Sequence, residues 1–338
     1  MKDDDDYDYN SELLLGGLVI AAGLIYVSQN KKPPKVEQDL IGKAVVITGG
    51  NSGIGAATAK ILNSRGADIF IGCRNTQGGE SLCNSFDNKR CHVSKLDFND
   101  WNSIDTFSKS VNEYYGKKGI DVLINNAGAM INEADKDTNY NIDKSMLVNH
   151  LGPIALSDKL MPSLLLTSKS KSNSLPRIVN VGSRLEKSAI APIDYNNNTI
   201  KEWLQTSPLP YSTFSAYANS KVAMTASTYA LAKTNDKVIA TVVTPGMVHT
   251  SLSRFIPSWQ QWLSWPLRKM MLRTPDQGAA SVIHAAVNKD VSSSKYYSSD
   301  KKGNISEIES STLSQDENFQ QKILQVSREI IRELDKKK

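Results

Sequence analysis

Short apolar runs rich in β-branched residues alternate along this chain with longer stretches of helical periodicity. Buried strands are predicted at 43–50, 67–74, 90–98, 119–128, 176–183 and 238–246. Helices are predicted between the strands and at the end of the chain, at 54–66, 101–116, 142–168, 215–233 and 316–338. Strands that alternate with helices of ten or more residues form parallel sheets with helices on both faces. The pattern therefore predicts an α/β fold with a doubly wound parallel sheet in a single domain.

The N-terminal region departs from this pattern. Leu13–Val27 is an uncharged apolar run of 15 residues, slightly short of the about 20 that a spanning helix needs. An acidic stretch precedes it and KKPPK follows it, whereas a cleaved secretory signal has a basic start. We expect a retained membrane anchor helix that spans the bilayer, lies in its interface or inserts as a hairpin, with the remaining chain on the cytoplasmic side. A signal or a buried helix is the alternative.

These features divide the chain into five parts. They are an acidic tail, the anchor, a linker, the α/β domain with a lid segment at about 250–273, and an extension ending in a helix. Their ranges are 1–12, 13–29, 30–40, 41–290 and 291–338.

Composition and charge exclude several classes of function. A hydrophobic content of 40% and a charged content of 22% fit a globular protein with a sizeable core. The net charge of +5 is mild and no long basic run occurs, so nucleic acid is not an expected partner. Cys73, Cys83 and Cys91 are odd in number and lack a metal-ligand spacing. We therefore expect free thiols in a reducing compartment and no metal site.

The sequence TGGNSGIG, 48–55, joins the first predicted strand to the first predicted helix. Gly49 permits a turn, Gly53 lets the backbone approach a pyrophosphate, and Gly55 allows close packing of the helix on the strand. The anion would lie at the positive end of the helix. A tight structural turn is the alternative. With this spacing of glycines the chain resembles the short-chain dehydrogenase/reductase superfamily, which implies a Rossmann-type domain and a nicotinamide cofactor.

The residue after the second strand selects the cofactor. Arg74 stands there, and a guanidinium suits the 2′-phosphate of NADP(H), whereas an acidic residue would bind the free ribose hydroxyl of NAD. A surface arginine is the alternative, and Asn51 and Ser52 supply no second positive charge. The resemblance implies that Asp97, after the third strand, contacts adenine; the alternative is a turn or capping residue.

A tyrosine and a lysine four residues apart lie on one face of a helix, where the ammonium can lower the pKa of the phenol. This spacing occurs five times: Tyr114/Lys118, Tyr140/Lys144, Tyr217/Lys221, Tyr229/Lys233 and Tyr297/Lys301. Tyr217/Lys221 alone follows the strand that ends at Ser183 and lies among small residues, SAYANSKVAMTAS. The other pairs are expected at the amino edge of the sheet, in a solvated polar stretch, three turns further along the same helix and in a C-terminal loop, and to be dispensable for chemistry.

The resemblance implies a catalytic group of four. Tyr217 is the acid/base, Lys221 favours its phenolate and bonds the nicotinamide ribose, Ser183 orients the substrate carbonyl, and Asn149 holds a water in a proton relay; an Asn149 bonded within the core is the alternative. The residues expected to bind the cofactor are Thr48, Gly49, Asn51, Ser52, Gly53, Ile54, Gly55, Arg74, Asp97, Asn126, Ala127, Gly128, Tyr217, Lys221, Pro245, Gly246, Val248 and Thr250.

Within the superfamily, CR, LINNAG, VNHLG and RTPDQGA resemble the retinol dehydrogenase group. That resemblance implies an enzyme that interconverts a lipophilic, retinoid-like alcohol and its aldehyde or ketone at the endoplasmic reticulum or a lipid droplet. A sterol- or polyprenol-type substrate and a non-catalytic membrane scaffold that binds NADP(H) are the alternatives, and a second copy of the chain is a candidate partner. Trp259, Trp262 and Trp265 suit one helix face that covers an apolar substrate, enters lipid or packs in the core. The 34 residues from Ser183 to Tyr217 exceed the interval expected in this group.

Overall fold

The computed structural model describes residues 38–132, 136–137, 140–170, 175–248, 272–300 and 303–337. Eight strands form one sheet in the order β10-β9-β8-β7-β4-β1-β2-β3. The strands are β1 (Ala44–Thr48), β2 (Asp68–Cys73), β3 (Cys91–Lys95), β4 (Val122–Asn125), β7 (Arg177–Val181), β8 (Ile239–Thr244), β9 (Tyr296–Ser299) and β10 (Ile305–Glu307). All neighbours pair in parallel except β10, which runs antiparallel to β9. The predicted doubly wound, Rossmann-type sheet is therefore confirmed.

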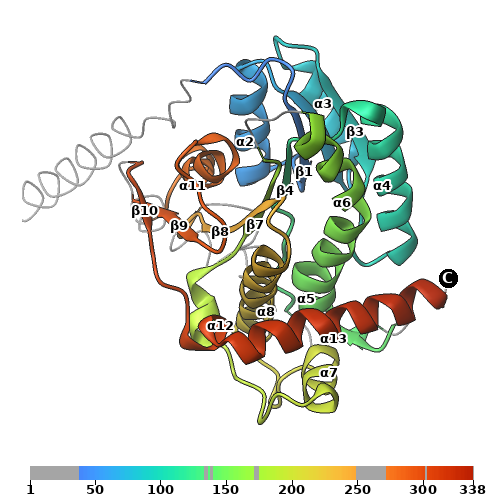
Figure 1. The fold of residues 1–338 in the computed structure, drawn as a ribbon, viewed down its shortest axis with the longest axis vertical. Coiled ribbons are helices and arrows are strands. Elements are labelled where there is room, and N and C mark those ends of the chain that lie inside the picture. Colours follow the sequence, from blue (N-terminus) through green and yellow to red (C-terminus); the bar gives the residue numbers. More distant parts are fainter. Residues whose placement is uncertain are drawn as a thin grey trace, which may run out of the picture.

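Helices cover both faces of this sheet (Figure 1). The longer ones are α2 (Gly53–Ser64), α3 (Thr76–Asn84), α4 (Trp101–Tyr115), α6 (Gly152–Ser170), α7 (Asn197–Gln205), α8 (Thr213–Thr234), α11 (Pro275–Val287) and α13 (Glu317–Lys336). The shorter ones are α5 (Lys144–Met146), a π-helical turn η2 (Leu147–Leu151), the 3₁₀ turns η1 (Gly116–Lys118) and η3 (Arg184–Ser188), and α12 (Thr312–Gln315). A two-stranded ribbon, β5 (Lys136–Asp137) and β6 (Ile142–Asp143), lies outside the main sheet.

The alternation of side chains along β1 separates two hydrophobic cores. Ala44 and Val46 face a core shared with α4, α6, α8 and α13. Val45 and Ile47 face the other core, shared with α2, α3 and α11. The central strands are therefore buried on both faces, which is why they appear in the sequence as continuous apolar runs.

The C-terminal part of the chain is integral to this fold. β9 and β10 extend the sheet beyond residue 290, and α13 (red in Figure 1) packs against α8, α7 and α6. The polar stretch between Ser183 and Tyr217 contains α7, which the sequence reading did not predict. Trp203 of α7 packs edge-on against Phe319 of α13. The long interval thus contributes to the second layer over α8.

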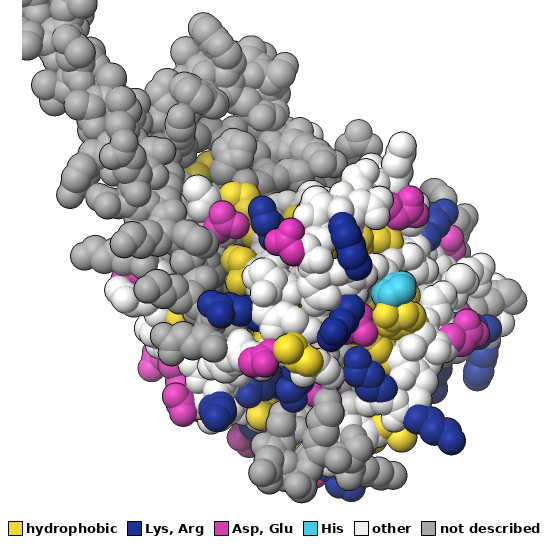
Figure 2. All heavy atoms as spheres, turned by 90° about the horizontal axis from the view of Figure 1, so that it is seen from above, with side chains coloured by type: hydrophobic (Ala, Val, Ile, Leu, Met, Phe, Trp, Pro, Cys, Tyr) yellow, Lys and Arg dark blue, Asp and Glu magenta, His cyan; other side chains and the backbone are white. Residues whose placement is uncertain are grey.

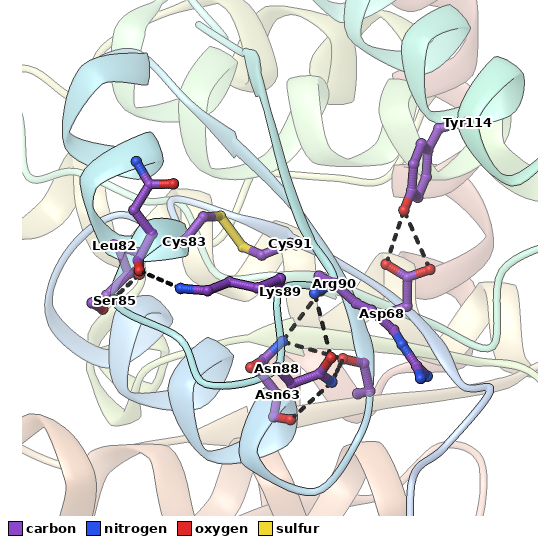
Figure 3. Close-up of a disulfide and its surroundings, with 12 residues drawn as sticks. Asn63, Asp68, Leu82, Cys83, Ser85, Asn88, Lys89, Arg90, Cys91 and Tyr114 are labelled. Carbon is purple, nitrogen blue, oxygen red and sulfur yellow. Dashed lines mark hydrogen bonds between the residues drawn. A yellow bond between two sulfur atoms is a disulfide. The ribbon is translucent and has the colours of Figure 1, made fainter.

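The prediction of three free thiols is wrong. Cys83, at the end of α3, forms a disulfide with Cys91, the first residue of β3 (Figure 3). Parallel pairing of β3 with β2 brings the end of α3 back to the start of β3, with 5.3 Å between the two Cα atoms. Cys73 is a free, buried thiol, and burial raises its pKa to about 11.

No helix in the described ranges is long and apolar enough to cross a membrane. The predicted anchor, 13–29, and the three tryptophans of the predicted lid lie outside the described residues. On the face shown in Figure 2, Lys and Arg side chains are interspersed with Asp and Glu, so neither sign of charge dominates it.

Candidate active site

A cavity of about 1280 Å³ opens at the carboxyl edge of the sheet. The chain reverses its direction of strand addition between β1 and β4, and open α/β sheets bind ligands at such a switch point. The predicted residues that line the cavity are Gly49, Asn51, Ser52, Gly53, Ile54, Arg74, Asp97, Asn126, Ala127, Gly128, Ser183, Tyr217, Lys221, Pro245, Gly246 and Val248. Thr48, Gly55 and Asn149 are not among its lining residues, and Thr250 lies outside the described residues. The fold thus brings together motifs that are up to 199 positions apart in sequence, Gly49 to Val248.

The glycine loop gives the cavity a site for an anion. Gly49 has a φ of +66°, in the left-handed region, and a Cβ at Gly55 would lie 2.3 Å from the carbonyl oxygen of Gly49. Only glycine allows α2 to begin this close to the loop. Ser52 is the N-cap of α2, yet its side chain makes no capping hydrogen bond. The first N–H groups of α2 are therefore free of a side-chain cap beside the cavity, and they fit a pyrophosphate.

Arg74 and Asp97 line one end of this cavity, where β2 and β3 end. Arg74 follows β2 directly, and its side chain is exposed on the cavity wall. Asn75 caps α3 by accepting the N–H of Gly78, and its carbonyl accepts the side-chain amide of Asn51. Asp97 accepts two hydrogen bonds from Asn99, as its alternative role in a turn requires. Asp97 also lines the cavity, so a contact with a nucleotide stays a prediction.

A hydrogen-bond network fixes the loop after β4. The hydroxyl of Thr48 accepts the N–H groups of Asn126 and Ala127, and the Asn126 amide donates to the carbonyls of Thr48 and Gly49. Thr48 therefore lies behind the cavity wall and joins the glycine loop after β1 to the loop after β4. These contacts explain why both motifs are needed for one site.

Asn149 lies in the π-helical turn η2, a feature that often occurs at functional sites. Its side-chain oxygen accepts the N–H of Ala129, while its amide donates to the carbonyl of Ala129 and the hydroxyl of Ser220. The side chain is 1% exposed. It thus holds the wall segment 126–129 in place, which agrees with the alternative of an asparagine bonded in the core, and the water relay stays a prediction.

Tyr217, Lys221 and Ser183 meet where α8 passes the ends of β7 and β4. The Lys221 ammonium donates to the carbonyl of Val181 at 2.8 Å and lies 5.5 Å from the centre of the Tyr217 ring. A Cβ at Gly128 would lie 3.3 Å from Lys221 Nζ, so the cavity wall closes tightly around the amine. Burial lowers the pKa of Lys221 to about 8 and raises the pKa of Tyr217 to about 12, a shift that the Ser183 hydroxyl opposes. The arrangement places a protonated phenol beside a cation whose charge depends on pH near 8.

The other tyrosine–lysine pairs lie elsewhere. Tyr114 donates to Asp68, the first residue of β2, at the amino edge of the sheet (Figure 3). Lys118 forms an ion pair with the same carboxylate. Tyr229 donates to Ser310, and Lys233 pairs with Glu317.

Two of the sequence expectations for these pairs are wrong. Tyr140 is partly buried and not fully solvated, because it packs on the core and its hydroxyl accepts the N–H of Trp101. Tyr297 is in the buried strand β9 instead of a loop, because that strand extends the sheet beside β8. Lys301 lies outside the described residues.

The apolar end of the cavity was not predicted from the sequence. Met130, Ile131, Leu185, Phe214 and Met247 line it near Tyr217. Phe214 precedes Tyr217 by three residues on α8, so helical spacing alone places both on one face. Met130, Ile131 and Met247 lie in loops and Leu185 lies in the short 3₁₀ turn η3, where no periodic pattern marks a residue.

A glycine loop at a helix N-terminus, a switch-point cavity and a buried tyrosine–lysine pair define a nicotinamide-dependent oxidoreductase of the short-chain type. Residues 43–193 match the short chain dehydrogenase family. Human retinol dehydrogenase 11 is 35% identical over 254 residues, 73% of this chain and 74% of that protein. Bovine retinol dehydrogenase 12 is 33% identical over 276 residues, 79% and 81% of the two chains.

Solved structures share the fold. An uncharacterised protein from Mycobacterium paratuberculosis superposes with a TM-score of 0.67 and 26% identity, covering 90% of this chain and 97% of the other. The NADP complex of RhlG from Pseudomonas aeruginosa shares the fold, with a TM-score of 0.60 and 22% identity over 78% of this chain and 96% of the other. The chain belongs to the short-chain dehydrogenase/reductase family, in its retinol dehydrogenase-like group, whose members are oxidoreductases of alcohol and carbonyl groups with a nicotinamide cofactor.

Proposed function

We propose that this protein is an NADP(H)-dependent oxidoreductase that interconverts a lipophilic, retinoid-like alcohol and its aldehyde or ketone, with Tyr217 as the acid/base. The observation that carries the proposal is the buried Tyr217/Lys221 pair beside Ser183, at an end of the cavity lined by apolar side chains. Apolar walls with a few placed polar groups suit a lipophilic substrate with one reacting oxygen.

The residues of this chain divide the chemistry among them. When bound, the nicotinamide supplies or accepts a hydride. In reduction, Tyr217 donates its phenolic proton to the carbonyl oxygen, and the Ser183 hydroxyl orients that oxygen. Lys221, fixed by the Val181 carbonyl, favours the phenolate left after proton transfer. In oxidation the same tyrosine removes the proton from the alcohol.

Arg74 supports the preference for NADP(H). Its exposed guanidinium follows β2 on the cavity wall, where a ribose 2′-phosphate would accept charge-assisted hydrogen bonds. The apolar run Leu13–Val27 supports a membrane attachment, which extraction of the full-length protein from vesicles with alkaline carbonate would test.

A substrate panel tests the function. Purified full-length protein is mixed with NADPH or NADH and with all-trans-retinal, a long-chain aldehyde, a sterol ketone or a polyprenal, and loss of the reduced cofactor is followed. We expect turnover of retinal or the long-chain aldehyde with NADPH. Tight NADPH binding without turnover of any substrate would contradict the enzyme proposal and favour a scaffold.

A charge reversal tests the cofactor preference. Arg74→Asp should weaken NADPH binding by about ten- to 100-fold, because a charge-assisted contact of roughly 1.5–3 kcal/mol becomes a repulsion. Arg90→Asp, which changes an exposed arginine before β3 at the opposite edge of the sheet, is the matched control and should leave binding within twofold. If Arg74→Asp kept the wild-type affinity for NADPH and the wild-type preference for NADPH over NADH, the role of Arg74 would be refuted.

A further inference from the structure

One carboxylate near the site is buried without a role in the proposed chemistry. Glu186 follows Ser183 by three residues, in the 3₁₀ turn η3, and is 0% exposed. The flanking side chains of Leu185 and Lys187 are exposed. A carboxylate is costly to bury unless it is hydrogen-bonded, so its partners explain why it points inwards.

Its partner is a serine 125 positions away in the sequence. The Ser311 N–H donates to one Glu186 oxygen at 2.7 Å, and the Ser311 hydroxyl donates to the other oxygen. Both oxygens thus accept from one residue, as an ionised carboxylate does. Ser311 also caps the short helix α12 by accepting the N–H of Ser314.

The segment that contains Ser311 is itself held in place. Tyr229 of α8 donates to the Ser310 hydroxyl, and Gln315 donates to the Ser310 carbonyl. Gln320, in the first turn of α13, donates to the carbonyl of Ser314. Residues 310–320 therefore form a fixed support behind the active-site wall.

Hydrogen bonds within the turn η3 connect Glu186 to Ser183. The Glu186 N–H donates to the Ser183 carbonyl at 3.0 Å, and the Leu185 N–H donates to the Ser183 hydroxyl oxygen at 3.3 Å. A single turn thus separates the anchored carboxylate from the hydroxyl that lines the cavity. Movement of Glu186 would move the Ser183 side chain with it.

We propose that Glu186 is a positioning residue, which fixes the Ser183 hydroxyl in the cavity wall by attaching η3 to Ser311 of the C-terminal segment. The inference rests on the proposed function, because Ser183 orients the substrate carbonyl in that reaction. The C-terminal extension would thus support the active site, although Ser311 lies 125 positions from Glu186 in the sequence.

A double-mutant cycle tests the coupling. Glu186→Gln keeps the size of the side chain but removes its negative charge and leaves one acceptor oxygen for the two Ser311 donors. We expect kcat to fall about tenfold, less than the roughly 10²-fold that loss of an orienting donor costs, with NADPH affinity within twofold of the wild type. In the Ser183→Ala background the same change should lower kcat by less than twofold, because Glu186 acts only through Ser183. A tenfold additive loss in that background would overturn the proposal.

The matched control is Asp158→Asn, which weakens the ion pair of α6 with Arg328 of α13 without touching the cavity. It should leave kcat within twofold. Hydrogen exchange of the amides at 183–189 is measured on the same proteins, and faster exchange in Glu186→Gln than in Asp158→Asn is expected. Unchanged exchange at 183–189 in Glu186→Gln would overturn the positioning role of Glu186, even if no substrate is turned over. If the wild type is inactive but exchange is faster in Glu186→Gln, only the proposed function is refuted.

Discussion

The two ends of α8 carry the same spacing of tyrosine and lysine in different surroundings. Towards its N-terminus, Tyr217 and Lys221 are both at most 5% exposed, and the ammonium bonds a backbone carbonyl. Towards its C-terminus, Tyr229 is buried against Ser310, while Lys233 is half exposed and paired with Glu317. Twelve positions separate the pairs, about three turns of helix.

A spacing of four residues does not by itself make a tyrosine an acid/base. The N-terminal pair has lost water but gained no carboxylate partner in the described residues, so the pKa of the amine falls to about 8. In the C-terminal pair, the ammonium of Lys233 is balanced by the Glu317 carboxylate, and neither Tyr229 nor Lys233 lines the cavity. The pair that is costly for folding is the one that suits catalysis.

We expect the greatest loss of activity when the hydroxyl of Tyr217 is removed. Tyr217→Phe should lower kcat by about 10²–10⁴-fold, because the proton donor is lost. Tyr229→Phe removes the matching hydroxyl at the other end of α8 and should keep kcat within twofold, because Gln315 and Gln320 still hold the segment around Ser311. Steady-state kinetics with NADPH measures both, and fluorescence titration should show that NADPH still binds. Similar losses in both variants would contradict the assignment.

The second prediction concerns the free energy of unfolding. The pKa of Lys221 is about 8 in the fold and about 10.5 in the unfolded chain, so the unfolded chain binds the proton more tightly. The resulting cost, about 3 kcal/mol, is full below pH 8 and disappears as pH rises to about 10.5. The stability of Lys221→Met relative to the wild type should therefore fall by about 3 kcal/mol from pH 7 to 10.5.

Urea unfolding at the two pH values measures this change. The absolute gain at pH 7 is smaller, because the Val181 carbonyl loses its donor, roughly 1–3 kcal/mol. Lys233→Met is the control and should show no such dependence on pH. A pH-independent difference for Lys221→Met would contradict the lowered pKa.

The third prediction concerns the pH profile of reduction. Tyr217, with a pKa of about 12, stays protonated, whereas Lys221 loses its charge above pH 8, so kcat/KM should decline there by at most about tenfold per pH unit. Lys221→Arg keeps the charge and should move the decline to higher pH. An identical midpoint in both proteins would exclude Lys221 as the titrating group.

The smallest effect is expected at the exposed pair. Glu317→Gln removes the carboxylate that pairs with Lys233. The side chain of Glu317 is 77% exposed and that of Lys233 is 43% exposed. Such pairs contribute about 0–1 kcal/mol, so thermal unfolding should change within that range and kcat within twofold. A larger change in kcat would show that the C-terminal end of α8 communicates with the cavity.

Much of the fold could be predicted because its signals are local. The apolar runs of β1, β2 and β4 and the helical period of α4 and α8 are properties of neighbouring residues, and the observed elements agree with the predicted ranges within a few positions. The glycine loop was readable because glycine spacing reflects backbone geometry. α7 was missed because its segment is polar, and its apolar positions, Ile200 and Leu204, point to a partner more than 100 residues away, α13.

The site was predictable as a set of positions but not as an environment. Spacing placed Tyr217 and Lys221 on one helix face, yet it could not give the bond of Lys221 to Val181 or the saturation of Asn149 by Ala129. The pairing of Cys83 with Cys91 was also hidden, since it depends on how β3 returns beside α3.

The alternation of strands and helices, the glycine loop at 48–55 and the order of the motifs could all be read from the amino-acid sequence, because they depend on preferences within a few residues. The context of the motifs already favoured Tyr217/Lys221 among the five tyrosine–lysine pairs, but only the tertiary structure shows that Lys221 bonds the Val181 carbonyl and that Glu186 supports Ser183. Burial, pKa and hydrogen-bond partners depend on contacts between residues 40 to 125 positions apart, which only the folded chain creates.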